Sequence, residues 1–446
     1  MQIISENVCS YLCNNWELFQ VYVVRIAMLD LKFIRQNPDK VRQVIQLKRG
    51  KDCLDRILEL DTQKRQKIGE VEKLRATQNK ENEEVAKAKK AGKDSADMIA
   101  RLTQISDKIK VLDAEMTTID AELDNLLLWI PNIPAPEVPD GGEENNKIVR
   151  SWGEPKKFDF TPKAHWDLGA NLGILEIERA ARMSSSGFIM LAGDGARLER
   201  AVINFMLDTH KGHGYKEFRT PYMVNRKAIT GTGQLPKMED DMYRLEKDDM
   251  FLIPTAEVAL GNIYQGEIIP GETLPLYVMA YSPCFRREAG SAGKDTRGML
   301  RIHQFNKVEL FQLVAEEDSV TALETVVKHA STILEKLNIP YRVVLLAGGD
   351  SSFASAKTYD LEIWSPGVGK WLEVSSCSTC TDFQARRANI RYKMKGGKPK
   401  FVHMLNGSGV ATPRLMSAIM ENYQQQDGHI VVPEVLRPYL LGQSLI

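Results

Sequence analysis

The chain is poor in cysteine, carries no net charge and contains no long hydrophobic run. Six cysteines among 446 residues are too few for a disulfide scaffold and favour a reducing, cytoplasmic setting. The 59 Lys and Arg residues balance 59 Asp and Glu residues, so a nucleic-acid or membrane partner would have to meet a local patch. No apolar run approaches the roughly 18 residues that a membrane-spanning helix needs, and we expect no membrane partner.

Residues 1–27 lack the features of a secretory signal. Leu18–Val24 is apolar, but it lies between Glu17 and Arg25, and no basic segment precedes it. A more regular sequence begins at Met28. We therefore treat residues 1–27 as an N-terminal extension and assign it no function.

Proline is absent between Pro38 and Pro131, and Lys, Glu, Gln and Ala are abundant there, which predicts long helices. Apolar residues recur at alternating spacings of four and three, the heptad seam of a coiled coil, at Met98, Leu102, Ile105, Ile109, Leu112, Met116, Ile119, Leu123 and Leu126. A looser seam precedes Gly92, at Leu54, Ile57, Ile68, Val71 and Val85. This order predicts an antiparallel hairpin of two helices, each of about 35 residues and about 50 Å.

The charges of this hairpin are segregated. Residues 64–93 hold ten basic and five acidic side chains, whereas residues 94–124 hold three basic and eight acidic ones. The basic residues are densest near the predicted tip, at Lys87, Lys89, Lys90 and Lys93. A solvated coiled-coil surface with salt bridges between the helices explains this pattern. A basic tip on a rigid rod is also suited to contact nucleic-acid phosphates, and both interpretations stay open at this point.

Proline and glycine cluster directly after the helical region, at Pro131, Pro134, Pro136, Pro139, Gly141 and Gly142. Such a cluster is typical of a linker between domains. We therefore divide the chain into a helical arm at 28–130, a linker at 131–149 and a second domain at 150–446. Short β-like runs in the second domain alternate with turns or single helices, at Tyr277–Tyr281, Val308–Val314, Tyr341–Leu346 and Trp371–Ser375. This order predicts an α+β fold, with helices packed on an antiparallel sheet.

Two short motifs suggest chemistry that their surroundings contradict. His210–His213 (HKGH) resembles the HxGH motif of class I aminoacyl-tRNA synthetases, but a helical apolar face runs into it and places it at the end of a helix. Cys377 and Cys380 form a CxxC pair that could hold zinc, but no second CxxC or CxxH pair accompanies them. We expect buried cysteines at a strand end and no structural zinc.

The segment Cys284–Glu309 combines charge and aromatic character in an unusual way. Its ends alternate like two antiparallel strands around a glycine-rich loop, so four side chains are predicted on one sheet face: Arg286, Glu288, Phe305 and Glu309. An arginine fork, an aromatic ring and carboxylates suit a triphosphate, a base and an ammonium ion. A salt-bridged exposed hairpin is the alternative, and it does not explain the phenylalanine.

This segment resembles motif 2 of class II aminoacyl-tRNA synthetases, and the chain from Met28 onward resembles bacterial-type seryl-tRNA synthetases. The other matches, in the order of that family, are the helical arm, motif 1 ending at Pro221, Thr255-Ala256-Glu257, Glu373-Val374-Ser375-Ser376, and Asn406-Gly407-Ser408-Gly409 followed by Arg414. Two positions depart from the family pattern: Arg287 replaces an expected Ser, and Thr379 replaces an expected Asn. The resemblance implies a class II catalytic domain preceded by a coiled-coil arm.

The resemblance also implies a role for each matched residue. Arg286 would bind the α-phosphate of ATP and Arg414 the γ-phosphate, while Glu373 and Ser376 would hold Mg²⁺. Glu288 would accept a hydrogen bond from the adenine amino group, and Phe305 would stack on the ring. The remaining ATP contacts implied are Arg287, Val374 and Ser375. The implied serine contacts are Thr255, Ala256, Glu257, Glu309 and Ser408. The tip lysines, Lys87, Lys89, Lys90 and Lys93, would contact tRNA.

The implied reaction is the activation of serine by ATP to seryl-adenylate, followed by transfer of serine to tRNA(Ser), with tRNA(Sec) open as a further acceptor. The enzyme would be a cytoplasmic homodimer that uses motif 1 as its dimer element. Two alternatives remain from the sequence. One is a class II synthetase for another amino acid, and the other is a catalytically inert coiled-coil protein that binds RNA or acts as a scaffold.

Overall fold

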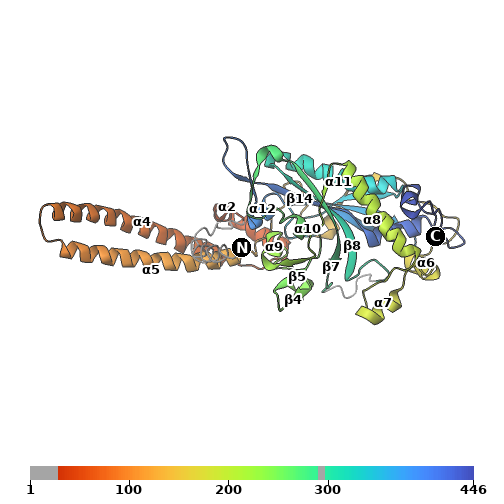
Figure 1. Ribbon diagram of the computed structural model, residues 1–446, viewed down its shortest axis with the longest axis horizontal. Helices are drawn as coiled ribbons and strands as arrows, with labels where there is room; N and C mark the ends of the chain where they lie inside the picture. The colour runs from red at the N-terminus through yellow and green to blue at the C-terminus, as the bar shows by residue number, and fades with distance from the viewer. Residues whose placement is uncertain (1–28, 290–296) are drawn as a thin grey trace, which may run out of the picture.

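The computed structural model describes residues 29–289 and 297–446, and it shows a long helical hairpin projecting from a larger α+β domain (Figure 1). The N-terminal extension and most of the glycine-rich motif 2 loop lie outside the described residues. Within the described ranges, no helix is both long and apolar enough to cross a membrane.

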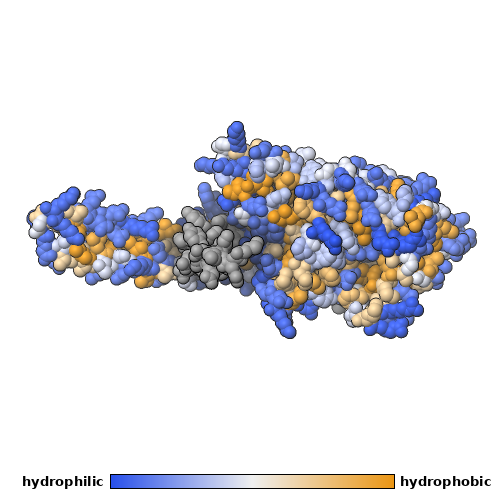
Figure 2. Space-filling view, in the orientation of Figure 1, coloured by the Kyte–Doolittle hydropathy of each residue, from blue (hydrophilic) through white to orange (hydrophobic). Residues whose placement is uncertain are grey.

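The hairpin, which we call the arm, consists of α4 (Leu54–Lys90) and α5 (Ala96–Leu127), preceded by the short helices α2 (Leu31–Gln36) and α3 (Pro38–Leu47). Helix α4 has 37 residues and spans about 55 Å at 1.5 Å per residue. All nine residues of the predicted α5 seam are buried or half-buried. Figure 2 shows hydrophobic side chains where the two helices meet and hydrophilic ones on the outer faces. The predicted antiparallel hairpin is therefore confirmed.

Ion pairs cross between the two helices over most of the arm. Arg56 pairs with Glu122 at 2.7 Å, Lys67 pairs with Glu115 at 2.5 Å, and Lys64 pairs with Asp120. Ile68 was wrongly assigned to the α4 seam, because it is exposed. The buried position before Val71 is Lys64 instead, whose aliphatic stem fills the seam while its ammonium reaches the acidic helix.

Five consecutive carbonyl oxygens of the catalytic domain, those of residues 352–356, accept hydrogen bonds from the root of the arm. Lys48, just after α3, donates to two of them from Nζ, at 2.8 and 2.5 Å. Asn132 donates to two others, at 3.0 Å from its backbone amide and 2.9 Å from its side chain, and the Ala135 amide donates to the fifth at 2.8 Å. Burial lowers the pKa of Lys48 to about 7. The arm is thus joined to the catalytic domain through buried polar contacts.

The catalytic domain is built on an eight-stranded sheet in the order β1-β9-β10-β11-β14-β8-β7-β2. Neighbouring strands are antiparallel except β2 and β7, which are parallel. The strands are β1 (Lys147–Trp152), β2 (Lys216–Glu217), β7 (Leu276–Phe285), β8 (Gln304–Val314), β9 (Tyr341–Leu345), β10 (Lys357–Ser365), β11 (Lys370–Thr379) and β14 (His403–Ala411). The sequence-based prediction of an α+β fold with an antiparallel sheet is confirmed.

The helices of this domain are α6 (His165–Asn171), α7 (Ile177–Ser184), α8 (Asp194–Gly212), α9 (Arg226–Gly231), α10 (Glu257–Leu260), α11 (Ser319–Lys336), α12 (Phe383–Ala388) and α13 (Thr412–Asn422). Two small three-stranded sheets accompany them, one of β3 (Met223–Asn225), β5 (Met250–Leu252) and β4 (Arg244–Leu245), the other of β13 (Lys400–Phe401), β12 (Arg391–Lys393) and β6 (Ile268–Pro270). Helix α8 ends at Gly212, so the HKGH segment lies at a helix end, as predicted.

Strand β8 separates the main core from a cavity, because its side chains alternate between the two faces of the sheet. Val308 packs with Leu198 of α8 and Val326 of α11 in the main core. Lys307 and Glu309, on either side of Val308, point to the opposite face of the sheet and line the cavity. Phe305 lies two residues before Lys307 and lines the cavity as well. The amphipathic pattern of one strand thus places polar groups beside a rigid, fully packed core.

The prediction that Arg286 and Glu288 project from a strand is wrong. Strand β7 ends at Phe285, whose partner in β8 is Gln304, and both charged residues follow that end. Glu288 has a φ of 52°, in the left-handed region, which turns the chain back toward the sheet. Both side chains still line the cavity.

Cys377 lies in β11 and Cys380 directly follows that strand, and both thiols are fully buried, as predicted for cysteines at a strand end. Burial raises the pKa of the Cys377 thiol to about 12, which keeps it protonated. In the described part of the chain, no group of three or more His, Cys, Asp or Glu side chains is arranged to hold a metal.

Candidate active site

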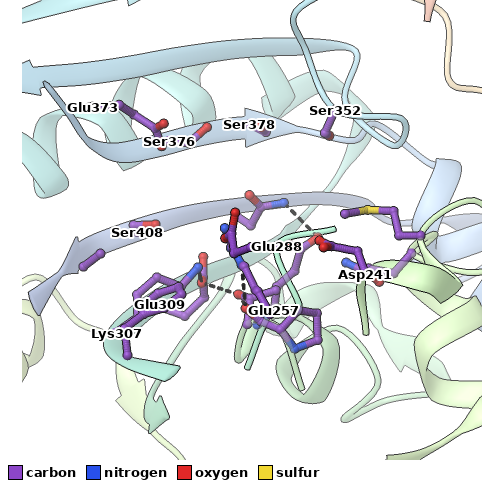
Figure 3. Close-up of a pocket in the computed structure, with 18 of the residues that line it drawn as sticks. Asp241, Glu257, Glu288, Lys307, Glu309, Ser352, Glu373, Ser376, Ser378 and Ser408 are labelled. Atoms are coloured by element: carbon purple, nitrogen blue, oxygen red, sulfur yellow. Dashed lines mark hydrogen bonds and ion pairs between the residues drawn. The ribbon is translucent and has the colours of Figure 1, made fainter. Parts of the chain in front are cut away.

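A cavity of about 450 Å³ lies on the face of the sheet opposite the main core. Figure 3 shows its polar lining: Glu373, Ser376 and Ser378 lie along β11, Ser408 lies on the neighbouring β14, and Lys307 and Glu309 lie on β8. The turn that holds Arg286 and Glu288, the Thr255–Glu257 segment and the loop at residues 352–354 complete the wall. The cavity therefore combines residues from nearly every part of the catalytic domain.

One end of the cavity is a small polar pocket around two carboxylates. The Thr255 hydroxyl donates to Glu309 at 2.7 Å, and Lys307 forms an ion pair with the same carboxylate. Glu309 is only 1% exposed, so its charge depends on these two partners. Ser408 lies directly opposite Glu309 in the pairing of β14 with β8. A small molecule that enters this pocket meets a hydroxyl, an ammonium and a carboxylate at one point.

Glu257 is the second carboxylate, at the start of α10. It accepts hydrogen bonds from the side-chain amides of Gln384 at 2.6 Å and Asn406 at 3.2 Å. Burial, and then repulsion from Glu309, raise the pKa of Glu257 to about 7. A bound cation would remove much of this cost, so the pocket is suited to an ammonium group.

Arg286 and Phe305 form a charged and aromatic wall in the middle of the cavity. The guanidinium carbon of Arg286 lies 5.2 Å from the centre of the Phe305 ring, and its Nε donates to the Pro254 carbonyl at 3.3 Å. The Arg286 backbone is held by the His303 carbonyl at 2.9 Å. Among the residues that the structure describes, the other donors of the guanidinium have no hydrogen-bond partner, so they are suited to a planar, anionic ligand.

The arginines Arg301 and Arg414 carry positive charge into the part of the cavity beyond Phe305. Arg301 forms an ion pair with Glu288. Arg414, in the first turn of α13, donates to the Leu300 carbonyl at 3.3 Å and to the Glu373 carbonyl and carboxylate at 2.6 and 3.2 Å. Three arginines thus face one cavity, which suits a polyphosphate.

A third carboxylate lies beside Glu373. Asp360 of β10 pairs across the sheet with Ser376 of β11. Its Oδ1 atom is buried and has no hydrogen-bond partner among the described residues. Burial and the neighbouring Glu373 raise the pKa of Asp360 well above its usual range. Oxygen ligands crowded in this way favour a hard divalent cation, and the group fits Mg²⁺.

Two family models match this chain. Residues 28–134 match the seryl-tRNA synthetase N-terminal domain, and residues 238–423 match the class II tRNA synthetase core domain (G, H, P, S and T). A serine–tRNA ligase of Caldanaerobacter subterraneus is 53% identical over 416 residues, which cover 93% of this chain and 98% of the relative. The chain belongs to the seryl-tRNA synthetase family.

Other members of the seryl-tRNA synthetase family are similar over the same extent. A serine–tRNA ligase of Clostridium tetani is 51% identical over 94% of this chain and 100% of its own length. The crystal structure of seryl-tRNA synthetase from Pyrococcus horikoshii complexed with ATP is 38% identical, has a TM-score of 0.89, and covers 94% of this chain and 99% of its own. The prediction of a class II catalytic domain behind a coiled-coil arm is confirmed, and the class I interpretation of HKGH is not favoured.

Of the ATP and serine contacts that the family resemblance implied, most line the cavity and three do not. The lining ones are Thr255, Glu257, Arg286, Glu288, Phe305, Glu309, Glu373, Val374, Ser376, Ser408 and Arg414. Ala256 is fully buried behind the wall, and the Ser375 hydroxyl donates to the Ser408 carbonyl at 2.6 Å, linking β11 to β14. The Arg287 side chain is exposed and outside the lining, while its backbone amide donates to Asp241.

Sequence reasoning missed several lining residues. Lys307 could have been found, because it alternates with Phe305 and Glu309 in the same strand. Arg301, and the buried Asp360, which is not itself part of the lining, gave no such signal, since their partners lie 13 and 16 positions away. The four tip lysines lie at the far end of the arm, exposed, and none of them forms an ion pair within the described ranges. They are distant from the cavity (Figure 1).

Proposed function

We propose that this protein is a serine–tRNA ligase that joins serine to ATP as seryl-adenylate, releases pyrophosphate, and transfers the seryl group to tRNA(Ser). The observation that carries this proposal is the cavity itself, in a chain of this family. One end is a two-carboxylate pocket sized for a small amino acid, and the other is a cationic wall with an aromatic ring. A cytoplasmic homodimer is part of the proposal, with α8 and the chain to Pro221 as the contact between subunits.

ATP binds along Arg286, Phe305 and Arg414 in this proposal. The adenine ring stacks on Phe305, which already has the Arg286 guanidinium over its ring. Glu288 accepts a hydrogen bond from the adenine amino group after giving up its ion pair with Arg301. Arg286 stabilises the negative charge that develops on the α-phosphate, and Arg414 binds the γ-phosphate. Val374 contributes to the wall beside them. These groups hold the α-phosphate in line for attack.

Mg²⁺ would be held by Glu373 and Ser376, with Asp360 close behind them. There it would supply positive charge that offsets the charge of the phosphates. The Oδ1 atom of Asp360 supports this placement, because a buried carboxylate oxygen that has no donor among the described residues costs free energy unless a cation is near. Two carboxylates do not complete a site alone, and the phosphates would supply the other ligands.

Serine binds in the pocket of Glu257 and Glu309. Its ammonium group meets Glu257, a buried carboxylate whose pKa is raised to about 7 by burial and then by the neighbouring Glu309, so that a cation placed there would be stabilising. Its hydroxyl lies near Glu309 and Ser408, so alanine, which cannot bond them, would be rejected by about 10⁴- to 10⁵-fold. Threonine is excluded by shape, since an extra methyl in a packed site costs about 1–3 kcal/mol. The serine carboxylate is already ionised, so its attack on phosphorus needs no general base.

The test of this function is amino-acid-dependent exchange of pyrophosphate into ATP, measured with each of the twenty amino acids. Exchange with serine alone is the expected result, and charging of tRNA(Ser) should follow on adding the RNA. Exchange with another amino acid would identify a different class II specificity. No exchange at all would favour an inert coiled-coil protein, and parallel charging of tRNA(Sec) would show whether it is a further acceptor.

The four tip lysines are proposed to contact tRNA phosphates. Changing Lys87, Lys89, Lys90 and Lys93 together to glutamine should weaken tRNA binding and flatten its salt dependence, by a slope of up to about 0.9 for each lost phosphate contact. The affinity for serine should not change, because the tip is far from the cavity. Binding measured at several salt concentrations checks the slope. An unchanged slope would leave these lysines as part of a solvated surface.

Serine affinity should fall below neutral pH because of Glu257. With a pKa of about 7 in the free protein, this carboxyl is increasingly protonated as the pH falls, whereas the bound ammonium group needs it ionised. The dissociation constant for serine should therefore rise about fivefold between pH 7 and pH 6. Calorimetric titration at both pH values measures the change, and the KM for ATP serves as the control. A dissociation constant that is flat from pH 8 to pH 5.5 would contradict this role.

A further inference from the structure

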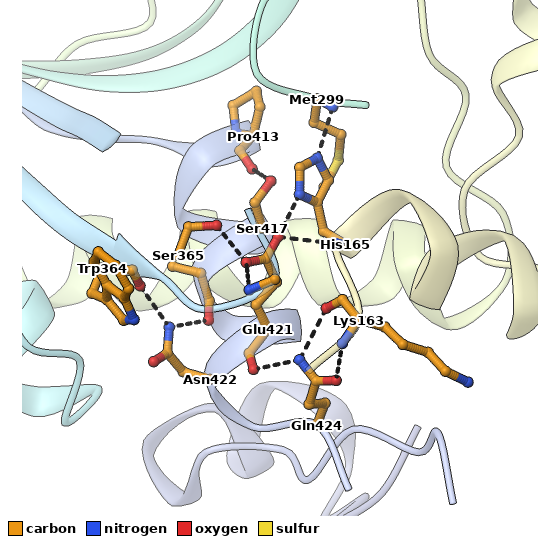
Figure 4. Close-up of polar contacts among 12 residues, drawn as sticks. Lys163, His165, Met299, Trp364, Ser365, Pro413, Ser417, Glu421, Asn422 and Gln424 are labelled. Carbon is orange, nitrogen blue, oxygen red and sulfur yellow. Dashed lines mark hydrogen bonds and ion pairs between the residues drawn. The ribbon is translucent and has the colours of Figure 1, made fainter. Parts of the chain in front are cut away.

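His165 and Glu421 form a fully buried pair outside the cavity, joining α6 to the end of α13 (Figure 4). Nδ1 of His165 lies 2.8 Å from Oε1 of Glu421, and the His165 backbone amide donates to the same oxygen at 2.9 Å. The other oxygen accepts from the Ser365 hydroxyl and from the Gly367 amide. His165 lies between the two family models and belongs to neither.

These contacts determine the hydrogen positions on the His165 ring. Both oxygens of Glu421 are engaged, one by the His165 amide and ring and the other by Ser365 and Gly367. Nε2 accepts a hydrogen bond from the Met299 backbone amide at 3.0 Å. An accepting Nε2 carries no proton, so the ring is neutral and in a single tautomer. The Glu421 carboxylate therefore selects the tautomer that can hold Met299.

Met299 leads directly to the ATP side of the cavity. Both Met299 and Leu300 line the cavity, and the Leu300 carbonyl accepts from Nε of Arg414 at 3.3 Å. The next residue, Arg301, forms the ion pair with Glu288. The segment that leads from the motif 2 loop to β8 is thus held at the buried Met299 amide, immediately before the two residues that contact the nucleotide-binding side chains.

The residue before Met299, Gly298, packs directly against the His165 ring. Gly298 has a φ of 67°, and a Cβ atom there would lie 2.3 Å from Nε2 of His165 and 2.7 Å from Trp166. A glycine is needed at this position both for the backbone conformation and for the close approach of the imidazole. The contact between His165 and Met299 therefore depends both on Glu421, which orients the ring, and on Gly298, which leaves space for it.

We propose that His165, oriented by Glu421, is a positioning residue for ATP in the adenylation step. Through the Met299 amide it fixes the Leu300 carbonyl and Arg301, and through them the orientation of Arg414 and Glu288. This inference rests on the proposed function, because it concerns how ATP is held. It predicts that a loss of the acceptor at Nε2 weakens ATP binding and slows adenylation without changing serine binding.

Two replacements of His165 separate its two hydrogen bonds. In His165→Asn the amide can still donate to Glu421 from the position of Nδ1, but nothing accepts from Met299. In His165→Gln the side-chain oxygen reaches the position of Nε2 and can accept from Met299. We expect His165→Asn to raise the KM for ATP and lower kcat of serine-dependent exchange, about 10- to 100-fold in kcat/KM, with the KM for serine unchanged. His165→Gln should restore most of this loss.

Ser365→Ala is the matched control, because it removes a hydrogen bond from the same buried carboxylate without touching Met299. It should lower Tm but leave the KM for ATP unchanged. Gly298→Ala is a second variant that displaces the ring from the other side and should show the ATP defect even if His165→Asn does not fold. An unchanged KM for ATP in a folded His165→Asn or Gly298→Ala protein overturns the inference, as does an equal ATP defect in Ser365→Ala. Inactivity of the unmodified protein would instead overturn the proposed function.

Discussion

Replacing Arg286 with alanine is expected to abolish serine-dependent pyrophosphate exchange while leaving the fold intact. In the proposed function the guanidinium stabilises charge that develops on the α-phosphate only in the transition state, so its loss should appear mainly in kcat. Removal of one such donor typically costs about 10²- to 10³-fold. The structural loss is small, because the side chain makes one 3.3 Å hydrogen bond and one contact with a ring. Steady-state exchange kinetics and thermal unfolding measure the two effects.

Arg150→Ala is a suitable control for this experiment. Arg150 is an exposed arginine on β1 that pairs with Glu324 at 3.0 Å, and it is not part of the cavity. We expect its exchange activity to match that of the unmodified protein. Near-normal exchange in a folded Arg286→Ala protein would remove Arg286 from the phosphate site.

Removing the outer arm is expected to separate the two halves of the reaction. The groups proposed to carry out adenylation all lie in the catalytic domain, whereas the basic tip lies at the end of a rod about 55 Å long. A deletion of residues 65–118, closed by a short turn, should leave serine-dependent exchange within about twofold. Aminoacylation of tRNA(Ser) should fall by about 10²-fold or more in kcat/KM, since loss of several phosphate contacts costs more than about 3 kcal/mol.

The limits of this deletion come from the contacts at the root of the arm. Lys64 and Asp120 are retained because they pair across the hairpin, and Lys48 and Asn132 are retained because they hold the loop at 352–356. A larger deletion would release residues 352–354, which line the cavity, and would confuse a structural defect with a loss of RNA binding. If the shortened protein charges tRNA as well as the intact one, the hairpin is a structural coiled coil only.

The sequence alone predicted the features that depend on near neighbours. The arm follows from a proline-free stretch with apolar residues at spacings of four and three, since a helix places such residues on one face whatever surrounds it. The position of Phe305 and Glu309 on one face of β8 follows from alternation in the same way, and Lys307 lies between them. The family motifs suggested the roles that we propose for these residues, because the order of the motifs along the chain can be read directly.

Only the tertiary structure decided which distant groups meet. Lys48 reaches carbonyl oxygens more than 300 positions away, and His165 meets Glu421 at a separation of 256 residues. Nothing in the local sequence marks these residues, because each is an ordinary polar residue in a helix or turn until packing buries it. Burial then leaves its hydrogen-bonding groups without water, so they must pair with whichever groups the fold brings beside them. The spacing of apolar residues reflects the local geometry of a helix or strand and can be read from the sequence, whereas the partners of buried polar groups depend on how the whole domain packs.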